Sequence, residues 1–447
     1  MPIRFVPTPE AVEPLPVPGL RECHDCGKLL RMPPFRRGAD VRCPRCDAVL
    51  RRGRERPLAT ALALASACLI LYAVTVLAPF LSLDLLGRVR HSRVGTGVVG
   101  FAQDGFWQLS ALVASTVVVA PLLRISLRLA VLCGLRLSRP PAWLHVPFRW
   151  HERLGPWAML EVFLFGALVS YTRLVDLASV GIGPAAYGLG LLVLTLAAAD
   201  ATFAPQAVWE ALDRRGRTEA GREGPPARPG AVEGLRPAAE TRRRIGCRCC
   251  HLLVEAEPGQ RCPRCGAALH RRKRDSAARC WALVLAAAIL YVPANWFPVM
   301  EIVSFGRGGP HTILGGVVEF VETGFWPLAL IVFLASVAVP VLKLAGLAAM
   351  LLGVRRRSAK RLRGRTRLYR FIEAVGRWSM IDVFVVSSLV ALVRFGALAS
   401  ISSEVGAACF AAVVVLTMLA AEAFDPRLMW DAAAAGRPAA PPHGRGR

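Results

Sequence analysis

Charged residues are scarce in this chain, and lysine is the scarcest of them. Asp, Glu, Lys and Arg make up 19% of the 447 residues, whereas a soluble chain usually carries about a quarter of such residues. Six long stretches carry no charged residue at all: 58–80, 105–123, 177–199, 280–300, 323–342 and 405–421. About 20 apolar residues in a helix are enough to cross a bilayer. A wholly soluble enzyme is therefore excluded, and the sequence predicts a polytopic membrane protein.

Catalytic and nucleotide-binding motifs are missing as well. The chain has no Walker A sequence, and His151-Glu152 lacks the second histidine of a zinc-protease helix. No nucleophile–base arrangement stands out. Gly95-x-Gly97-x-x-Gly100 matches the dinucleotide-binding fingerprint only in its letters, because no βαβ unit surrounds it. We interpret that segment as a flexible loop, and we expect no enzyme activity.

The net charge of +25 would indicate a nucleic-acid partner in a soluble protein, but the placement of the charge argues otherwise. The basic clusters 51–56, 124–153, 210–279 and 355–370 lie in alternate connections between the apolar stretches. Membrane proteins distribute Lys and Arg in this way on their cytoplasmic side. We therefore expect no nucleic-acid partner and a cytoplasmic location for both termini. No secretory signal is apparent, so the apolar stretch at 58 is the first expected membrane-targeting element.

An internal repeat divides the chain into two similar halves. Val98-Val99-x-Phe101-x-x-x-Gly105-Phe106-Trp107 recurs as Val317-Val318-x-Phe320-x-x-x-Gly324-Phe325-Trp326, at an offset of 219 residues. Paired cysteines, prolines and tryptophans follow in the same order. Each half therefore combines one cysteine module with one membrane module.

Four helices are predicted in each membrane module, near 57–83, 104–136, 155–176 and 178–204, and near 279–303, 323–354, 375–400 and 403–424. The predicted fold class is an all-α polytopic membrane protein with two repeated four-helix modules and two small cytoplasmic zinc ribbons. The expected organisation is a disordered segment 1–20, zinc ribbon 21–52, transmembrane module 57–209, basic disordered linker 210–245, zinc ribbon 246–272, transmembrane module 279–432 and disordered tail 433–447.

Two four-cysteine motifs stand in the polar modules. Two Cys-x-x-Cys turns at short separation present four thiolates to one tetrahedral metal ion, and small modules of this kind depend on the metal to fold. We predict two structural zinc ions, with a rubredoxin-like iron site as the alternative. Asp47 and His251 stand where glycine is favoured, and Cys249 offers a competing thiol. The predicted ligands are Cys23, Cys26, Cys43 and Cys46, and Cys247, Cys250, Cys262 and Cys265.

Charged and polar side chains inside the second membrane module form a second candidate site. Lys343 is expected about 16 Å into the sixth helix from its basic end, and Asp382 about 10 Å into the seventh. Ser336, Ser379 and Thr417 lie within reach as hydrogen-bonding neighbours. A charge at mid-bilayer costs about 2.5–3.5 kcal/mol, so such groups normally face partners or water.

Corresponding residues in the first half suggest that this network is duplicated. Arg124, Glu161 and Thr195 occupy the positions of Lys343, Asp382 and Thr417. Two interpretations of the network remain open. It serves a function, or it is a buried ion pair or snorkelling lysine that only fixes helix packing.

The chain resembles the paraquat-inducible protein A family in several strings, and the resemblance spans about residues 20 to 435. The first half departs from the pattern, with Glu161 for Asp, Arg124 for Lys and Phe203-Ala204-Pro205 for Phe-Asp-Pro. The strings are Cys-Pro-Arg-Cys twice, Gly324-Phe325-Trp326, Val339-Pro340-Val341-Leu342-Lys343, Trp378-Ser379-Met380-Ile381-Asp382-Val383-Phe384, Leu416-Thr417-Met418 and Phe424-Asp425-Pro426-Arg427.

This resemblance implies an inner-membrane protein of a diderm bacterium. Family members are encoded beside proteins with mammalian-cell-entry (MCE) domains, whose rings form a hydrophobic tunnel across the periplasm. The implied function is to pass membrane lipids, with phospholipid as the expected class, between that tunnel and the inner membrane. The residues themselves leave two alternatives: a membrane-bound electron carrier with iron in its cysteine sites, or a membrane-anchored regulator whose zinc ribbons bind nucleic acid or a cytoplasmic protein.

Overall fold

The computed structural model describes residues 15–16, 19–33, 40–51, 58–85, 87–137, 141–175, 179–219, 244–304, 307–393 and 399–435. The expected linker residues 220–243, and most of the expected terminal segments, lie outside this part. Eight of the described helical segments are long and apolar enough to cross a membrane. The prediction of a mostly helical chain with eight spans is therefore confirmed.

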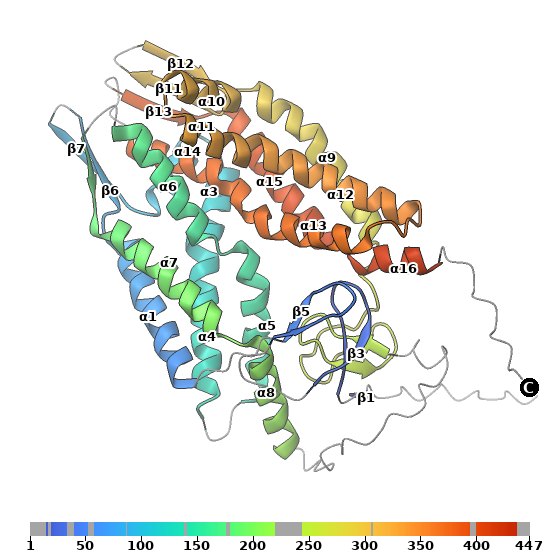
Figure 1. Ribbon diagram of the computed structural model, residues 1–447. Coiled ribbons are helices and arrows are strands. Elements are labelled where there is room, and N and C mark those ends of the chain that lie inside the picture. Colours follow the sequence, from blue (N-terminus) through green and yellow to red (C-terminus); the bar gives the residue numbers. More distant parts are fainter. Residues whose placement is uncertain are drawn as a thin grey trace, which may run out of the picture.

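The first module contains four spans, which Figure 1 draws in blue to green. A short helix α2 (Thr96–Gln103) precedes the second span, and η2 (Ala142–Leu144) precedes the third. Helix α8 (Pro205–Glu219) follows the fourth span and extends into the segment expected as linker. The spans are α1 (Leu58–Leu77); α3 (Trp107–Val113), η1 (Ala114–Val119) and α4 (Ala120–Gly134); α5 (His145–Leu154), η3 (Gly155–Trp157) and α6 (Leu160–Val175); and α7 (Pro184–Thr202).

The second module repeats this order in yellow to red (Figure 1). Helix α10 (Ile313–Glu322) corresponds to α2, and α16 (Arg427–Ala435) follows the last span. The spans are α9 (Ser276–Trp296); α11 (Trp326–Phe333), η5 (Leu334–Ala338) and α12 (Val339–Arg355); α13 (Leu362–Val375), η6 (Gly376–Met380) and α14 (Ile381–Leu392); and α15 (Val405–Ala423).

The second and third spans of both modules depart from regular α-helix at equivalent places. In the second spans, the π-helical turns η1 and η5 precede the repeated prolines Pro121 and Pro340. A proline ring clashes with the carbonyl four residues earlier, and a wider turn accommodates it. In the third spans, the tight 3₁₀ turns η3 and η6 separate a short polar helix from the apolar one. Each module thus contains two irregular turns, at which the backbone N–H and C=O groups do not all form the regular hydrogen bonds of an α-helix.

The two modules meet through their third spans. Every residue of α14 is buried, and α14 packs against α6. A Cβ atom on Gly166 of α6 would lie 2.9 Å from Cβ of Phe384, so only glycine permits this approach. Ser170 Oγ donates to the carbonyl oxygen of Val385 across the same contact, at 3.2 Å. Small residues therefore bring the central helices of the two halves together.

Two three-stranded sheets cover the end of the modules that lies away from the cysteine motifs, and the sequence did not predict them. Strand β6 (Leu81–Leu85) pairs with β7 (Arg88–Ser92) and β8 (Ser179–Ile182), and β11 (Met300–Ser304) pairs with β12 (Arg307–His311) and β13 (Ala399–Ser403). The helices expected near 57–83 and 279–303 end at Leu77 and Trp296, because prolines follow at 79 and 298.

The segment Gly95–Gly100 is not a flexible loop, so that interpretation is wrong. Gly97 and Gly100 belong to α2 and are buried. A Cβ atom on Gly97 would lie 2.1 Å from Oγ of Ser387 and 2.6 Å from its carbonyl oxygen. The glycine is needed because α2 packs directly on α14 of the other module.

Each cysteine module is a small ribbon of short strands. Ribbon 1 (residues 19–51) contains β2 (Leu20–Glu22), β3 (Leu29–Arg31), β4 (Val41–Arg42) and β5 (Val49–Arg51). Ribbon 2 (residues 244–269) contains β9 (Arg244–Gly246) and β10 (Leu253–Glu255). Strand β1 (Leu15–Pro16), from the N-terminal part of the chain, adds to the edge of ribbon 2 next to β10.

The ribbons are crossed: each packs on the membrane module of the other half. Ribbon 1 shares an apolar cluster with Leu347, Met350 and Trp430 of the second module. Ribbon 2 shares one with Val131, Phe148 and Trp209, which lie on α4, α5 and α8 of the first half. Both ribbons sit at the end of the molecule opposite the three-stranded sheets (Figure 1). The cytoplasmic face expected from the charge pattern corresponds to this ribbon end.

Candidate metal centres and polar clusters

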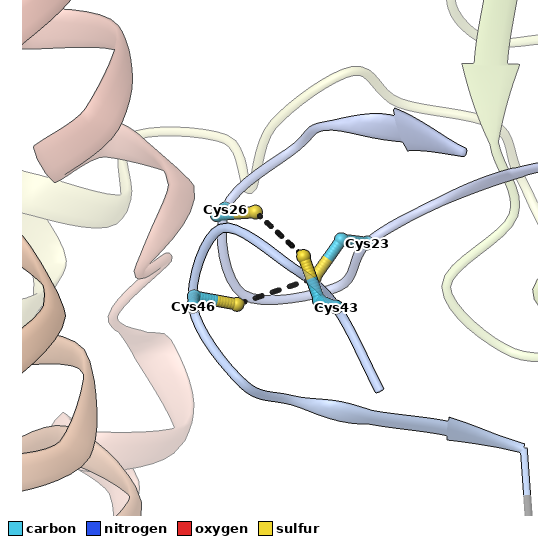
Figure 2. A group of neighbouring side chains, drawn as sticks. All are labelled: Cys23, Cys26, Cys43 and Cys46. Carbon is cyan, nitrogen blue, oxygen red and sulfur yellow. Dashed lines mark hydrogen bonds between the residues drawn. The ribbon is translucent and has the colours of Figure 1, made fainter. Parts of the chain in front are cut away.

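The eight predicted metal ligands form two buried groups of four. In ribbon 1, Sγ of Cys23 lies 3.6 Å from Sγ of Cys46, and Cys26 lies 3.6 Å from Cys43 (Figure 2). In ribbon 2, the corresponding distances are 3.4 Å for Cys247–Cys265 and 3.6 Å for Cys250–Cys262. Four sulfurs placed tetrahedrally at about 2.3 Å from one ion would lie about 3.8 Å apart. Both groups therefore match a tetrahedral four-sulfur metal site.

The same backbone turn presents all four Cys-x-x-Cys pairs. The N–H of the residue after each pair donates to the carbonyl of its first cysteine, as in Gly27 to Cys23 and His251 to Cys247. That residue has a positive φ in each turn, between 57° and 68°. Glycine adopts this conformation at the least cost. Asp47 and His251 adopt it nevertheless, with φ of 64° and 57°, so the turns tolerate the two departures from glycine.

Metal ligands of this kind must lose their protons, and hydrogen bonds among the four thiols favour this for one cysteine of each group, whereas they raise the pKa of the Cys26 and Cys250 thiols. Hydrogen bonds from Cys23 and Cys26 lower the pKa of the Cys46 thiol to about 4. Hydrogen bonds from Cys247 and Cys250 lower the pKa of the Cys262 thiol in the same way. Cys249 stays half-exposed outside the group. The arrangement can therefore bind two metal ions without the competing thiol.

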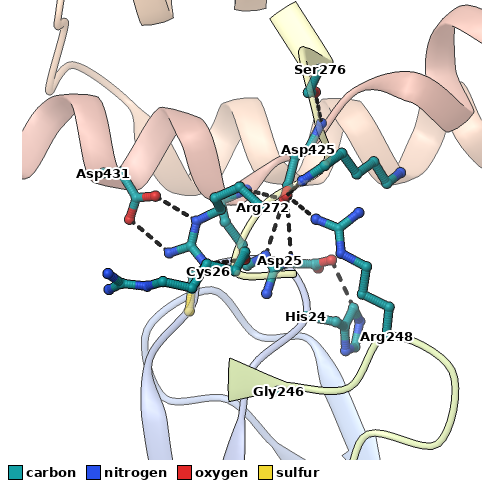
Figure 3. Close-up of polar contacts among 12 residues, drawn as sticks. His24, Asp25, Cys26, Gly246, Arg248, Arg272, Ser276, Asp425 and Asp431 are labelled. Carbon is teal, nitrogen blue, oxygen red and sulfur yellow. Dashed lines mark hydrogen bonds and ion pairs between the residues drawn. The ribbon is translucent and has the colours of Figure 1, made fainter. Parts of the chain in front are cut away.

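A cluster of buried charges joins ribbon 2 to the second module. Its centre is Asp425, which is 2% exposed and lies between α15 and α16. Arg427 Nε donates to its carboxylate at 3.1 Å, and Arg248 of ribbon 2 forms an ion pair with it (Figure 3). The backbone N–H of Lys273 donates to it at 3.2 Å. Burial alone would raise the pKa of Asp425, but the hydrogen bond and charge of Arg427 and the charge of Arg248 lower it.

Ribbon 1 joins the same cluster and also contacts α13. Glu22 accepts from Arg427 Nη1 at 3.0 Å, and its other oxygen accepts from the N–H of Gly246 in ribbon 2 at 3.1 Å. On α13, Arg370 Nε donates to Asp25 at 2.7 Å, and Nη2 donates to the carbonyl of Cys46. Helix α13 leads directly into η6, so ribbon 1 contacts the helix that positions the polar site of the second module.

Lys343 lies at the centre of that polar site. It is 2% exposed, and its Nζ donates to the carbonyl oxygen of Gly376 at 2.9 Å and to Oγ1 of Thr417 at 3.4 Å. Thr417 in turn donates to the carbonyl oxygen of Val414 at 2.9 Å. The 3₁₀ turn η6 begins at Gly376, where the break in the third span leaves a carbonyl available to the ammonium.

The other predicted members of the site are buried around this contact. Ser336 lies in the π-turn η5 and donates to the carbonyl of Val332 at 2.6 Å. Ser379 lies in η6, and its Oγ is buried without a hydrogen-bond partner in the described part of the chain. Asp382 is 9% exposed in the first turn of α14, where a helix N-terminus favours a carboxylate. The hydrogen bonds of Lys343 thus join it to Gly376 and Thr417, and Ser379 and Asp382 follow Gly376 in η6 and α14.

The three first-half equivalents do not form a matching site. Arg124 pairs with Asp200 at 2.9 Å, and Glu161 pairs with Arg377 of the second module at 3.0 Å. Thr195 is half-buried and donates within its own helix to Leu191, at 2.7 Å. The repeat did not reveal Asp200, whose only sign in the sequence is a carboxylate at the end of an apolar helix.

Comparison with known proteins adds to this geometry. The family model described as paraquat-inducible protein A matches residues 58–213 and 277–434. The chain is 32% identical over 417 residues to intermembrane transport protein PqiA of Escherichia coli (strain K12), covering 92% of this chain and 95% of that protein. It is 30% identical over 426 residues to lipophilic envelope-spanning tunnel protein A of the same organism, with 95% and 94% coverage.

A probable intermembrane transport protein of Haemophilus influenzae is 26% identical over 421 residues, with 92% and 95% coverage. No solved structure gives a significant match. The family model matches the membrane modules of both halves, and the relatives cover 92% to 95% of the chain, so the similarity is not confined to one module.

Proposed function

Because the chain belongs to the paraquat-inducible protein A family, we propose that it is the inner-membrane subunit of an MCE-type system that carries lipids between membranes. It takes up or delivers phospholipid at one end of a periplasmic tunnel formed by an MCE-domain partner. The names of its relatives, an intermembrane transport protein and a lipophilic envelope-spanning tunnel protein, support this proposal. The eight spans support the membrane location.

The observation that carries this proposal is the buried Lys343 site. An ammonium inside an apolar helix bundle is costly, and such groups usually mark functional sites. Here the ammonium donates to a carbonyl of the irregular turn η6. Broken helices at membrane depth commonly form substrate sites, because their free backbone groups and charges are available to a ligand. In this chain, η5, η6, Lys343 and Thr417 provide such groups together. We assign them the role of contacting or gating a lipid headgroup.

The surface of the second module supports its role as the transporting half. Leu330 and Ile331 of α11 and Leu334 of η5 are exposed to between 47% and 50%. The residues at the equivalent positions of the first module are Ala111, Leu112 and Ser115, of which only the half-buried Leu112 is a large apolar side chain. This difference accompanies a difference in packing. Helix α2 of the first module packs on α14 of the second, whereas no comparable contact joins α10 to α6 among the described residues. Acyl chains can therefore approach the second module from the bilayer.

The ribbons complete the proposal. We assign zinc to both four-cysteine sites, with a structural role, because the ribbons have small apolar cores and hold their shape through the cysteines. We place the ribbon end in the cytoplasm, following the basic connections. The three-stranded sheets then face the periplasm, on the side where a tunnel partner would dock. No residue arrangement in the described part of the chain supports catalysis.

Three variants test the transport site: Lys343→Ala, Asp382→Ala, and Lys343→Met combined with Asp382→Leu. We expect all three to accumulate in the membrane and to fail to restore envelope integrity in a strain that lacks this protein. Buried charged groups with a purely structural role often tolerate matched apolar replacement. A well-expressed double variant that fully restores envelope integrity would therefore show that Lys343 and Asp382 serve only helix packing.

Thr417→Ala and Thr195→Ala provide a matched pair of controls. Both remove one threonine hydroxyl from the fourth span of a module, but only Thr417 contacts the lysine. We expect loss of function for Thr417→Ala alone. Equal loss in both would indicate a general effect on helix stability, which is not what the proposed site requires.

A further inference from the structure

The first module contains a cluster of two arginines and one aspartate that the transport proposal does not use. Arg124 and Arg128 lie one turn apart on α4, and Asp200 lies near the end of α7. Arg124 Nη2 donates to Asp200 Oδ2 at 2.9 Å, and Arg128 Nη1 donates to Oδ1 at 2.7 Å. Arg128 also donates to the carbonyl of Ala199 and lies over the ring of Phe203.

The charges in this cluster do not balance. An arginine stays protonated in proteins, so two guanidiniums meet one carboxylate and leave one positive charge over. The neighbouring His151, whose Nδ1 donates to the carbonyl of Arg124 at 3.0 Å, adds no negative charge because an imidazole is either neutral or positive. An excess charge in or near the bilayer calls for a counter-ion.

Donors in the cluster are also left over. The Nε atoms of Arg124 and Arg128 are buried and have no hydrogen-bond partner in the described part of the chain. Water cannot easily replace that partner at Arg128, because the residue is only 4% exposed. A small cavity lies beside them, lined by Ala65 and Cys68 of α1 and by Leu196 and Ala199 of α7. A buried donor without an acceptor costs free energy, so the cluster is built for one more acceptor than the chain supplies.

The depth of the cluster indicates the source of that acceptor. Arg128 lies six residues, or about 9 Å, from the ribbon-side end of α4, and Arg124 lies about 15 Å from it. The outer side is open, since the side chains of Asp200 and Arg124 are 43% and 21% exposed. Further along α7, Leu191 and Leu194 are exposed to 54% and 68%. A charged opening therefore adjoins an apolar surface within one leaflet.

We propose that this cluster binds the phosphate diester of a phospholipid from the leaflet on the ribbon side. A diester carries the single negative charge that the cluster lacks, and its oxygens can accept from two forked guanidiniums at once. The acyl chains lie along the exposed leucines of α7. The site is separate from Lys343 and does not depend on lipid transport, so it goes beyond the proposed function.

The test measures equilibrium binding of fluorescent phosphatidylglycerol to the purified full-length protein in detergent. It uses the Lys343→Ala background so that the transport site contributes less. Unlabelled phosphatidylglycerol should compete about tenfold or more strongly than diacylglycerol with the same chains, which lacks the charged acceptor. Competition by inorganic phosphate at similar concentration would mean that the cluster binds phosphate from solution and not the headgroup of a lipid. Equal competition by the two lipids would overturn the proposal.

Two variants with opposite expected effects guard against misfolding. Arg124→Gln leaves a neutral Arg128–Asp200 pair, and we expect it to weaken phosphatidylglycerol binding by about tenfold or more. Asp200→Asn removes the competing carboxylate and raises the net charge, so we expect tighter binding. Thr195→Ala, on the same helix as Asp200, is the matched control and should bind like the unaltered chain. Unchanged binding in Arg124→Gln, or weaker binding in Asp200→Asn, would refute the site. Failure of Lys343→Ala to transport lipid while it still binds phosphatidylglycerol would separate the two proposals.

Discussion

Replacement of Asp425 by asparagine should destabilise the contact between ribbon 2 and the second module. The side chain is 2% exposed and accepts charge-assisted hydrogen bonds or ion pairs from Arg427 and Arg248. Asparagine keeps the shape but removes the charge that two buried or half-buried guanidiniums depend on. Breaking a buried ion pair from one side costs about 3–5 kcal/mol. Arg427 retains Glu22 at 3.0 Å, and Arg248 is partly exposed, so we expect about 3 kcal/mol.

The carboxylate is ionised under ordinary conditions, which makes the comparison meaningful. The folded protein lowers the pKa of Asp425 from its usual value of 3.8, because the hydrogen bond and charge of Arg427 outweigh the effect of burial. A lowered folded-state pKa means that the contribution to stability is present at pH above 3.8. It is lost only as the pH falls through the lowered value.

Asp431→Asn is the matched control. Asp431 also binds an arginine, with Arg272 Nε at 2.6 Å, but its side chain is 48% exposed. Exposed ion pairs contribute about 0–1 kcal/mol, so this variant should behave almost like the unaltered chain. The two variants are compared by thermal unfolding in the same detergent, with the release of bound metal as the signal. Equal midpoints for the two variants would refute the assignment of Asp425 as the centre of the contact.

Two further predictions concern the ribbons and the orientation of the chain. Cys262→Ser should reduce bound zinc from about two equivalents to about one and lower the amount of folded protein, since metal binding by four thiolates is part of the folding energy; red absorption and iron in the purified protein would instead support an electron carrier, and unchanged metal content would remove the site. Reporter fusions near residues 92 and 308 should be periplasmic, and fusions between 210 and 279 cytoplasmic, and a periplasmic signal from the latter would overturn the orientation.

The spans and the metal ligands were predictable because their patterns are local. An uncharged run such as 58–80 can only satisfy its backbone as a helix in a bilayer. Two Cys-x-x-Cys pairs can only be brought together by a short ribbon. The strands were missed because β6 has five residues and directly follows a much longer apolar helix. The alternation Leu81-Ser82-Leu83-Asp84-Leu85 and Pro79 before it were the available indications.

The long-range pairs were not predictable from one sequence. Depth along a helix placed Lys343 near Thr417, and the structure joins them, but depth says nothing about which way a helix faces. The repeat made Glu161 the counterpart of Asp382, but it could not show that the Glu161 side chain faces the other module and pairs with Arg377. The role of Asp425 was hidden for the same reason. Its string Phe424-Asp425-Pro426-Arg427 was noticed as a resemblance, whereas its partner Arg248 is 177 residues away.

The crossed ribbons make the two halves of this chain mutually dependent. Suppose that the halves were produced as separate polypeptides. The first would carry a ribbon whose apolar face packs on the second, and the second would carry a ribbon whose apolar face packs on the first. The two pieces would then associate by exchanging ribbons, as subunits do in a domain-swapped dimer. In the intact chain, the same exchange is made within one molecule, so neither half is a self-sufficient folding unit.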